Sequence, residues 1–165
     1  MIEVRRFGKS DIDRVVEIYA QGIEKGKSTF NTEVPTAESW DKNHLEICRL
    51  GAFDGDRLVG WTALQATSSR ECYKGVCEVS LYIDEDYQSQ GVGKQLMAEL
   101  VKESEKRGVW TLYRAIFSTN IRSIKMCLAN GWRIVGTREN IAKDRFGVWQ
   151  STTIMERRSK TVGVD

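Results

Sequence analysis

Residues 81–94 carry the most recognisable chemistry in this sequence. An apolar, strand-like run, Leu81–Ile83, leads through a polar turn into Gln-Ser-Gln-Gly-Val-Gly-Lys, where a long amphipathic pattern begins. Two glycines, Gly91 and Gly93, let backbone amides approach a ligand, and the N-terminus of the expected helix offers unpaired N–H groups and a partial positive charge. The spacing predicts a phosphate or pyrophosphate site, with a glycine-rich helix start that binds nothing as the alternative.

Several other kinds of chemistry are excluded by what is missing. The sequence has no Gly-x-x-x-x-Gly-Lys-Ser/Thr motif and no third glycine to complete a dinucleotide fingerprint. Its one histidine, His44, lies in an expected helix without a nucleophile motif nearby, so Ser-His-Asp and Cys-His catalysis are discarded. The cysteines, Cys48, Cys72, Cys77 and Cys127, form no Cys-x-x-Cys pair, and we expect free thiols and no metal site.

Length and composition indicate one globular domain over residues 1–165. Hydrophobic residues make up 41% of the chain, charged residues make up 29%, and the formal net charge is +2. This balance disfavours a dedicated nucleic-acid binder, and no apolar run is long enough to span a membrane. The N-terminal segment has no apolar signal region, so we expect a cytoplasmic protein without a nucleic-acid or membrane partner.

Hydrophobic periodicity predicts a mixed α/β (α+β) fold in which about seven strands are flanked by about four helices. Helices are expected from a Ser10 cap onward, from Thr36 to about Cys48, over Gly91–Arg107 and over Ile121–Ala129. Strands are expected at Ile2–Phe7, Gly51–Phe53, Arg57–Thr67, Val76–Ile83, Trp110–Phe117, 132–139 and 145–156. The segments at 25–35 and 68–75 are expected to be loops.

Taken together, these motifs resemble the GNAT superfamily of acetyl-CoA-dependent N-acetyltransferases. The resemblance rests on Gln-x-x-Gly-x-Gly after a strand, on Asn120-Ile121-Arg122-Ser123 after the next strand, and on Asn130-Gly131-Trp132. It implies that the glycine-rich loop holds the pyrophosphate of acetyl-CoA with backbone amides and that the preceding strand pairs with pantetheine. The residues implied in acetyl-CoA binding are Leu81, Tyr82, Ile83, Gln88, Ser89, Gln90, Gly91, Val92, Gly93, Lys94, Asn120 and Ser123.

A narrower resemblance points to the phosphinothricin/methionine sulfoximine acetyltransferase branch. It rests on the segments Ser28–Pro35, Glu78–Ile83 and Phe146–Trp149. It implies acetylation of the α-amine of a small amino-acid analogue, a loop that closes over the substrate, and a homodimer. The residues we expect around the substrate are Phe30, Thr32, Glu33, Ser68, Ser69, Arg70, Glu78, Val79 and Ser80; Arg70 could grip a carboxylate or be a solvated loop arginine.

Glu78 is the expected general base. An ammonium must lose a proton before its nitrogen attacks a thioester, and a carboxylate on a central strand can take that proton directly or through water. Burial there would raise its pKa toward neutrality. Alternatively, Glu78 faces solvent or balances Arg70 or Lys74, and Glu33 is the competing carboxylate.

Cys127 occupies the position where relatives carry a tyrosine or histidine that protonates the departing thiolate. A thiol of ordinary pKa near 8.5 could donate that proton, or Cys127 could be a small buried apolar residue, with water as the acid. The branch also carries an aspartate where this chain has Ser151. The alternatives to an amino-acid acceptor are a peptide N-terminus, a polyamine, an aminoglycoside, or an acyl-CoA sensor without turnover.

Overall fold

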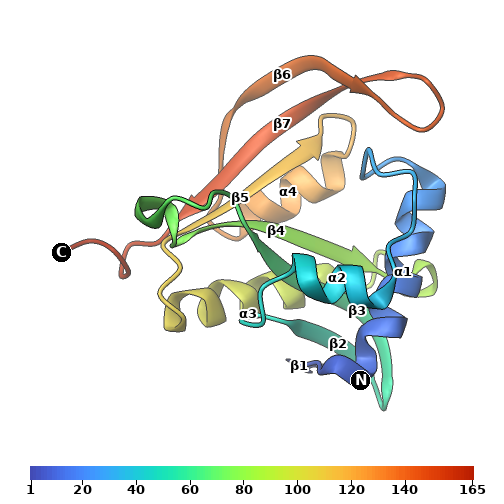
Figure 1. The fold of residues 1–165 in the computed structure, drawn as a ribbon, viewed down its shortest axis with the longest axis horizontal. Helices are drawn as coiled ribbons and strands as arrows, with labels where there is room; N and C mark the ends of the chain where they lie inside the picture. Colours follow the sequence, from blue (N-terminus) through green and yellow to red (C-terminus); the bar gives the residue numbers. More distant parts are fainter.

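A seven-stranded sheet forms the centre of the protein in the computed structural model, which describes residues Met1–Asp165 (Figure 1). The strands lie in the order β1-β2-β3-β4-β5-β7-β6, and all neighbours are antiparallel except β4 and β5. They are β1 (Ile2–Arg6), β2 (Leu50–Asp54), β3 (Arg57–Ala66), β4 (Val76–Ile83), β5 (Thr111–Phe117), β6 (Arg133–Lys143) and β7 (Trp149–Arg158).

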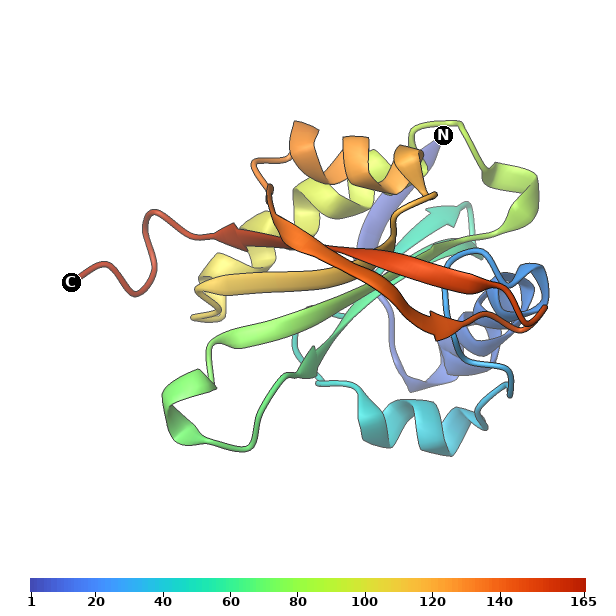
Figure 2. The same cartoon turned by 90° about the horizontal axis from the view of Figure 1, so that it is seen from above.

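Four helices cover the two faces of the sheet, which confirms the predicted α/β fold. The helices α3 (Val92–Lys106) and α4 (Ile121–Ala129) lie on one face, and α1 (Ile12–Lys25) and α2 (Ala37–Asn43) lie on the other (Figure 2). None of them combines the length and the apolarity that a bilayer crossing requires.

Each face of the sheet has its own apolar core. On the α3 face, Val92, Leu96 and Leu100 recur at helical spacing and are buried against the strands. On the α1 face, a similar stripe from α1 packs with Trp40 and Trp61. Each Å² of apolar area buried in these two layers stabilises the fold by roughly 25 cal/mol, and the strands between the layers carry the candidate site.

The strands β4 and β5 pair only at their beginnings and then separate. Their parallel ladder ends where Glu78 lies opposite Tyr113. Beyond that point β4 stays paired with β3 as far as Ile83, and β5 stays paired with β7 as far as Phe117. The facing edges of β4 and β5 therefore have no strand partner, and Figure 1 shows the two strands diverging. Backbone groups on such edges need another hydrogen-bond partner.

The expected start of the first helix at a Ser10 cap is wrong. A short 3-10 turn, Lys9–Asp11, comes first, and α1 begins at Ile12. The carboxylate of Asp11 accepts the backbone N–H of Gly8 at 2.9 Å. This local bond closes a turn ahead of the helix, and Ser10 lies within that turn.

The second helix ends at Asn43, five residues before the predicted end at Cys48. His44 is extended, with φ −119° and ψ 144°. The buried guanidinium of Arg49 donates to the backbone carbonyls of Asp41, His44 and Leu45. Because one arginine satisfies three carbonyls, the chain can leave the helix without orphaned acceptors.

The last hairpin turns later than predicted. Residues 145–148 form the turn between β6 and β7, although the sequence predicted a strand from 145 onward. The Asp144 carboxylate accepts the backbone N–H groups of Phe146 and Val148 at 2.9 and 3.0 Å, and Gly147 takes φ +78°. This is aspartate turn chemistry, which competes with strand pairing.

Candidate active site

The gap between β4 and β5 opens into a cavity of about 280 Å³. Its walls come from α1, the loop that follows α1, and strands β3, β4, β5 and β7. The sequence-predicted residues that line it are Phe30, Glu78, Val79, Ser80, Leu81 and Tyr82. The strand separation thus brings six of the predicted residues to one place.

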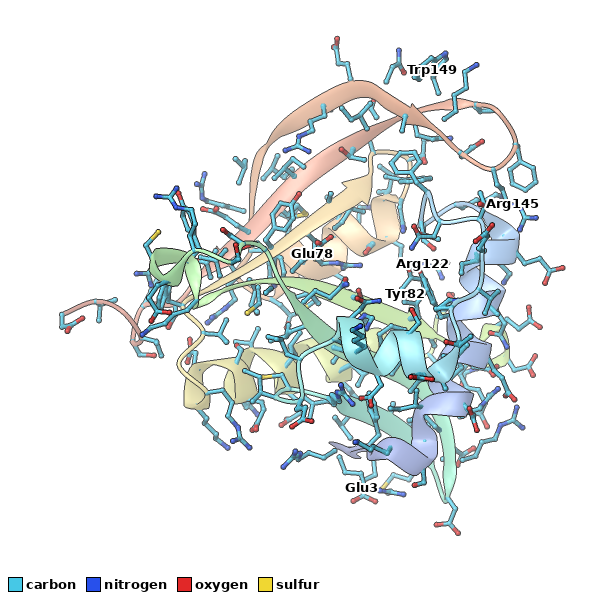
Figure 3. The ribbon with its side chains drawn as sticks, viewed as in Figure 1. Glu3, Glu78, Tyr82, Arg122, Arg145 and Trp149 are labelled. Carbon is cyan, nitrogen blue, oxygen red and sulfur yellow. The ribbon has the colours of Figure 1, made fainter.

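Glu78 lies beside the point where the two strands part (Figure 3). Strand alternation puts Glu78, Ser80 and Tyr82 on the α1 face, whereas Val79 and Leu81 pack toward the α3 core. The carboxylate of Glu78 makes no hydrogen bond or ion pair within the protein. Burial raises its pKa, and the charge of nearby Arg114 opposes that rise. A half-buried carboxylate with a raised pKa and no protein partner is suited to accept a proton from a ligand.

Arg114 is the cavity residue that sequence reasoning missed. It follows Tyr113 on β5, and its Nη1 donates to Ser123 Oγ at 3.0 Å and to Cys127 Sγ at 3.4 Å. It is the only cation on the cavity wall. The sequence did contain a signal, because Arg114 is the one charged residue in the run 112–117, which is otherwise apolar or aromatic. A strand buried on both faces rarely contains an unpaired charge, so the arginine indicated a polar environment on one side of this strand.

The glycine-rich loop presents unpaired backbone donors. The N–H groups of residues 88–94 donate to no acceptor in the protein, and they sit at the start of the 15-residue helix α3. Ser89 and Gly91 take left-handed conformations, with φ +63° and φ +80°. Consecutive free N–H groups at a helix N-terminus form an anion-binding cradle. The loop predicted from the sequence thus has the backbone geometry of an anion site, and phosphate binding there stays a prediction.

Three side chains of this loop are engaged within the protein. Gln88 Nε2 donates to Ile83 O at 2.9 Å, and Gln90 Nε2 donates to Asp86 O at 3.0 Å. Val92 is buried in the core. A ligand at residues 88–94 would thus meet backbone N–H groups together with the exposed side chains of Ser89 and Lys94.

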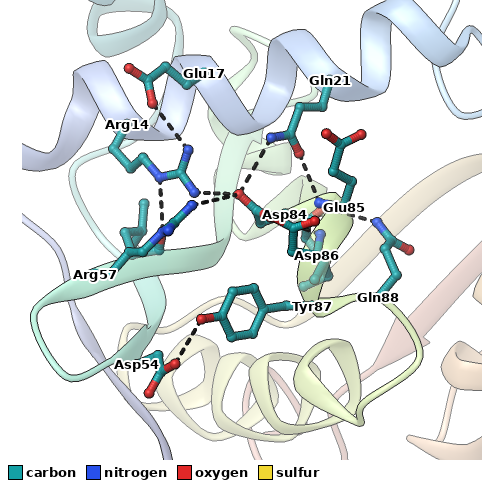
Figure 4. Close-up of polar contacts among 12 residues, drawn as sticks. Arg14, Glu17, Gln21, Asp54, Arg57, Asp84, Glu85, Asp86, Tyr87 and Gln88 are labelled. Atoms are coloured by element: carbon teal, nitrogen blue, oxygen red, sulfur yellow. Dashed lines mark hydrogen bonds and ion pairs between the residues drawn. The ribbon is translucent and has the colours of Figure 1, made fainter.

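A polar network anchors the start of the loop to the rest of the fold (Figure 4). Asp84 is buried, and its carboxylate accepts from Arg14, from Gln21 and from the backbone N–H of Asp86. Gln21 in turn accepts from the N–H of Glu85 at 3.0 Å. Burial alone would raise the pKa of Asp84, but these donors hold it below its usual range. The network fixes the loop relative to α1.

The segment after α1 covers the cavity. Phe30 packs on Phe117 with ring centroids 4.6 Å apart, and Asn31 hydrogen-bonds to the hydroxyl of Tyr19. The tip of the β6–β7 hairpin reaches the end of α1, where Arg145 donates to the carbonyl of Ile23 at 2.9 Å (Figure 3). Phe30 and Asn31 of the segment after α1 both line the cavity.

A second cavity of about 380 Å³ adjoins the first and shares Tyr19, Asn31, Gln65 and Ser80 with it. Glu33 lines this second cavity, not the one that contains Glu78. Its far wall is Trp40 and His44, whose rings stack 4.0 Å apart. Thr32 is exposed and lines neither cavity.

Besides Thr32, three further predicted substrate residues lie outside both cavities. Ser68, Ser69 and Arg70 lie in the loop after β3, where Ser68 Oγ accepts the backbone N–H of Arg70 at 3.1 Å. The Arg70 guanidinium lies over the ring of Tyr73, 5.3 Å from its centre. The loop starts at the end of the sheet where β4 begins, so it points away from the separated ends of β4 and β5.

The residues expected on α4 have roles inside the protein. Asn120 caps the helix, and its side-chain oxygen accepts the N–H of Ser123 at 3.3 Å. Cys127 is completely buried, packs in the α3-side core and does not line the cavity. The other cysteines are free thiols as well, and no group of His, Cys, Asp or Glu side chains is placed to share a metal ion.

The same architecture occurs in GNAT-superfamily acetyltransferases. The crystal structure of a phosphinothricin acetyltransferase of this superfamily from Sinorhizobium meliloti, in complex with acetyl-CoA, superposes with a TM-score of 0.91 at 22% identity, over 99% of this chain and 91% of that one. The sequence pattern of the Acetyltransferase (GNAT) family matches residues 13–132, and the chain belongs to this family.

Two relatives resemble the chain over most of its length. The Bacillus subtilis protein YwnH, a candidate phosphinothricin acetyltransferase, is 30% identical over 138 residues, covering 81% of this chain and 85% of YwnH. An L-methionine sulfoximine/L-methionine sulfone acetyltransferase of Pseudomonas paraeruginosa is 23% identical over 169 residues, covering 93% of this chain and 92% of that protein. The protein is thus an acetyltransferase with relatives in the branch that the sequence indicated.

Proposed function

We propose that this protein transfers the acetyl group of acetyl-CoA to the α-amine of a small amino acid or amino-acid analogue, of the phosphinothricin, methionine sulfoximine or methionine sulfone type. The observation that carries the proposal is the position of Glu78. Its unpartnered carboxylate stands where β4 and β5 part, at the apex of the gap and on the wall of the cavity. The names of the relatives support the same acceptor class.

The residues of the chain suit acetyl-CoA. When bound, acetyl-CoA supplies an acetyl group activated as a thioester. The free N–H groups of residues 88–94 would hold its pyrophosphate. The unpaired edge of Leu81–Ile83 would pair with its pantetheine arm, and the side-chain NH₂ of Asn120, which has no partner in the protein, is a further donor.

Glu78 would remove a proton from the acceptor ammonium, directly or through one water, so that the nitrogen can attack the thioester carbon. A backbone N–H near Leu81 would stabilise the oxygen charge that develops during the attack. Because Cys127 is buried away from the cavity, we assign protonation of the departing thiolate to water. Direct attack is preferred to an acyl-enzyme, since no activated nucleophile lines the cavity.

The size of the site favours small acceptors. Phe30 lines a cavity of about 280 Å³ that shares four lining residues with the neighbouring cavity lined by Glu33. Such a volume suits an amino acid with a short polar side chain. The homodimer and the cytoplasmic location stay predictions.

Product mass spectrometry tests the proposal. The protein is incubated with acetyl-CoA and a panel of amines: ordinary amino acids, methionine sulfone, methionine sulfoximine, phosphinothricin, polyamines, an aminoglycoside and a short peptide. We expect one of the amino acids or analogues to gain an acetyl group fastest. Faster acetylation of a polyamine, aminoglycoside or peptide would overturn the acceptor class. Binding of acetyl-CoA without any acetylated product would indicate a sensor.

A further inference from the structure

Residues 27–35, which connect α1 to α2 and bring Phe30 and Asn31 to the cavity, have little backbone support. We call this stretch the cover segment. None of its residues belongs to a helix or strand, and none makes a backbone–backbone hydrogen bond. A segment with so few backbone bonds opens at a low free-energy cost, so its position depends on side-chain contacts and on its two ends. One end is Thr36, the N-cap of α2, and the other is Gly26, directly after α1.

The tip of the β6–β7 hairpin packs on the Gly26 end. Figure 1 shows the hairpin arching toward the end of α1. Gly26 is buried and left-handed, with φ +65°. An alanine Cβ at this position would lie 2.6 Å from Cγ of Arg145 and 2.9 Å from Cε2 of Phe146. The two side chains therefore fill the space beside Gly26, and any larger residue there would displace the tip.

Arg145 also completes the last turn of α1. Its Nη1 donates to the carbonyl of Ile23 at 2.9 Å, and that carbonyl accepts no backbone N–H. A cation is favoured at a helix C-terminus, where the helix dipole is negative. The turn that presents Arg145 is ordered by Asp144, whose carboxylate accepts the N–H groups of Phe146 and Val148. One guanidinium thus joins parts of the chain that are 122 residues apart in sequence.

We propose that Arg145 is a positioning residue for the acceptor: it anchors the hairpin tip to the end of α1 and so holds the cover segment over the cavity. The proposal rests on the proposed function, which places the acceptor in that cavity. The hairpin is itself a wall of the site, because Thr152 of β7 lines the cavity together with Phe30. Arg145 therefore ties two walls of the acceptor site to each other, far from the loop at residues 88–94.

The test combines kinetics with limited proteolysis of Arg145→Met, which keeps most of the packing and removes the charge and the donor. Trypsin cleavage after Lys27 reports opening of the cover segment. If the acceptor binds only the closed form and trypsin cuts only the open form, the factors by which KM and the cleavage rate rise multiply to the shift in the open–closed equilibrium. We expect a product of about 10, as for one lost hydrogen bond from a charged group, with KM raised at least about twofold. The kcat and the dissociation constant for acetyl-CoA should stay within about twofold.

Matched variants separate anchoring from a general loss of stability. Arg138→Met removes an exposed arginine from the same hairpin, one whose side chain makes no hydrogen bond or ion pair, and should change neither KM nor cleavage. Gly26→Ala and Gly55→Ala both place a Cβ on a left-handed residue, but the space around Gly55 is open. We expect both to lower the thermal midpoint and only Gly26→Ala to raise KM, which tests the anchor without changing Arg145.

Three results would overturn the assignment. An unchanged KM in Arg145→Met, whatever the cleavage rate, would mean that the anchor does not govern acceptor binding. A fall in kcat at constant KM would place Arg145 in the chemical step. Equal losses of affinity for the acceptor and for acetyl-CoA would indicate a loosened fold. Failure of the proposed function is distinguishable, because wild type would then acetylate another class of amine, and KM for that amine would still report on the anchor.

Discussion

Glu78 pairs with Tyr113 in the last rung of the parallel β4–β5 ladder, and the cavity opens directly beyond this rung. The pairing fixes the backbone of Glu78, while the separation of the strands leaves its carboxylate facing the cavity. One residue further along β5, Arg114 lines the cavity from the other face of the sheet, where it is bonded to Ser123 and Cys127 on α4. The point of strand separation therefore sets the position of the candidate base.

Replacing Glu78 with Gln should stop proton removal without disturbing acetyl-CoA binding. The amide has the same shape but cannot accept the proton, so we expect kcat to fall on the order of 10²-fold or more. The dissociation constant for acetyl-CoA should stay within about twofold, because its expected contacts are backbone groups of the loop at residues 88–94. Glu71→Gln, on the exposed loop, is the control. Unchanged turnover in Glu78→Gln would remove Glu78 from the mechanism.

The pH dependence of kcat/KM should show the ionisation of Glu78 on its acid side. The base works in its ionised form, so activity rises with pH as Glu78 loses its proton, and burial places that rise above the ordinary glutamate range. Arg114 lowers the pKa of Glu78. Arg114→Met should therefore move the acid limb to higher pH, and Glu78→Gln should abolish it. The limb should not move in Arg138→Met, and an unmoved limb in Arg114→Met would contradict the coupling.

Gly91 and Gly55 form a matched pair of left-handed glycines, with φ +80° and φ +61° and open space around both. Substitution by Ala should cost about 1–2 kcal/mol of unfolding free energy at either position, because a Cβ is disfavoured there. Gly91 opens helix α3 in the phosphate-binding loop, whereas Gly55 turns the β2–β3 hairpin. We expect only Gly91→Ala to weaken acetyl-CoA binding, by about 10-fold or about 1.4 kcal/mol. Calorimetry checks both, and equal affinity in the two variants would argue against the loop.

Asp84→Asn should destabilise the fold and loosen the loop together. Losing the charged hydrogen bond to Arg14 should cost about 2 kcal/mol of unfolding free energy at neutral pH. The pKa of Asp84 is lowered in the folded protein, so its contribution is present above the unfolded pKa, near 3.8, and is lost as pH falls through the folded pKa. The difference between wild type and variant should shrink in acid. Urea unfolding at several pH values measures this, with exposed Asp56→Asn as the control; a pH-independent difference would contradict the linkage.

Local sequence patterns predicted the architecture well, because most helices and strands are determined by the hydrophobic periodicity of a few consecutive residues. The strands expected at Arg57–Thr67 and Val76–Ile83 and the helix expected over Gly91–Arg107 appear in the structure with ends within one residue of the prediction. The predicted ends of elements are wrong where a side chain elsewhere in the chain determines the end. The end of α2 depends on Arg49, which lies outside the helix and binds its last carbonyls. The last turn depends on the Asp144 carboxylate, which accepts the backbone N–H of Val148.

Contiguous motifs identified some of the residues at the candidate site, and three-dimensional proximity adds another. Glu78 lies in such a motif and lines the cavity, and the loop at residues 88–94 has free N–H groups; the functions of both stay predictions. Arg114 belongs to no motif, and it lines the cavity only because β5 leaves β4 just before it. Arg70 was placed at the site because of its chemistry, but the loop that carries it begins at the other end of β4.

Cys127→Ser tests the acid role that the resemblance suggested. The hydroxyl is close in size and can still accept the N–H of Arg114, so the fold should survive the change with a loss of about 1 kcal/mol. A serine hydroxyl is far too weak an acid to replace a thiol as proton donor. If water protonates the departing thiolate, as the complete burial of Cys127 indicates, kcat should stay within about threefold of wild type. Single-turnover measurements of acetyl transfer give the rate of the chemical step directly. A loss on the order of 10²-fold, with the thermal midpoint nearly unchanged, would instead make Cys127 the proton donor.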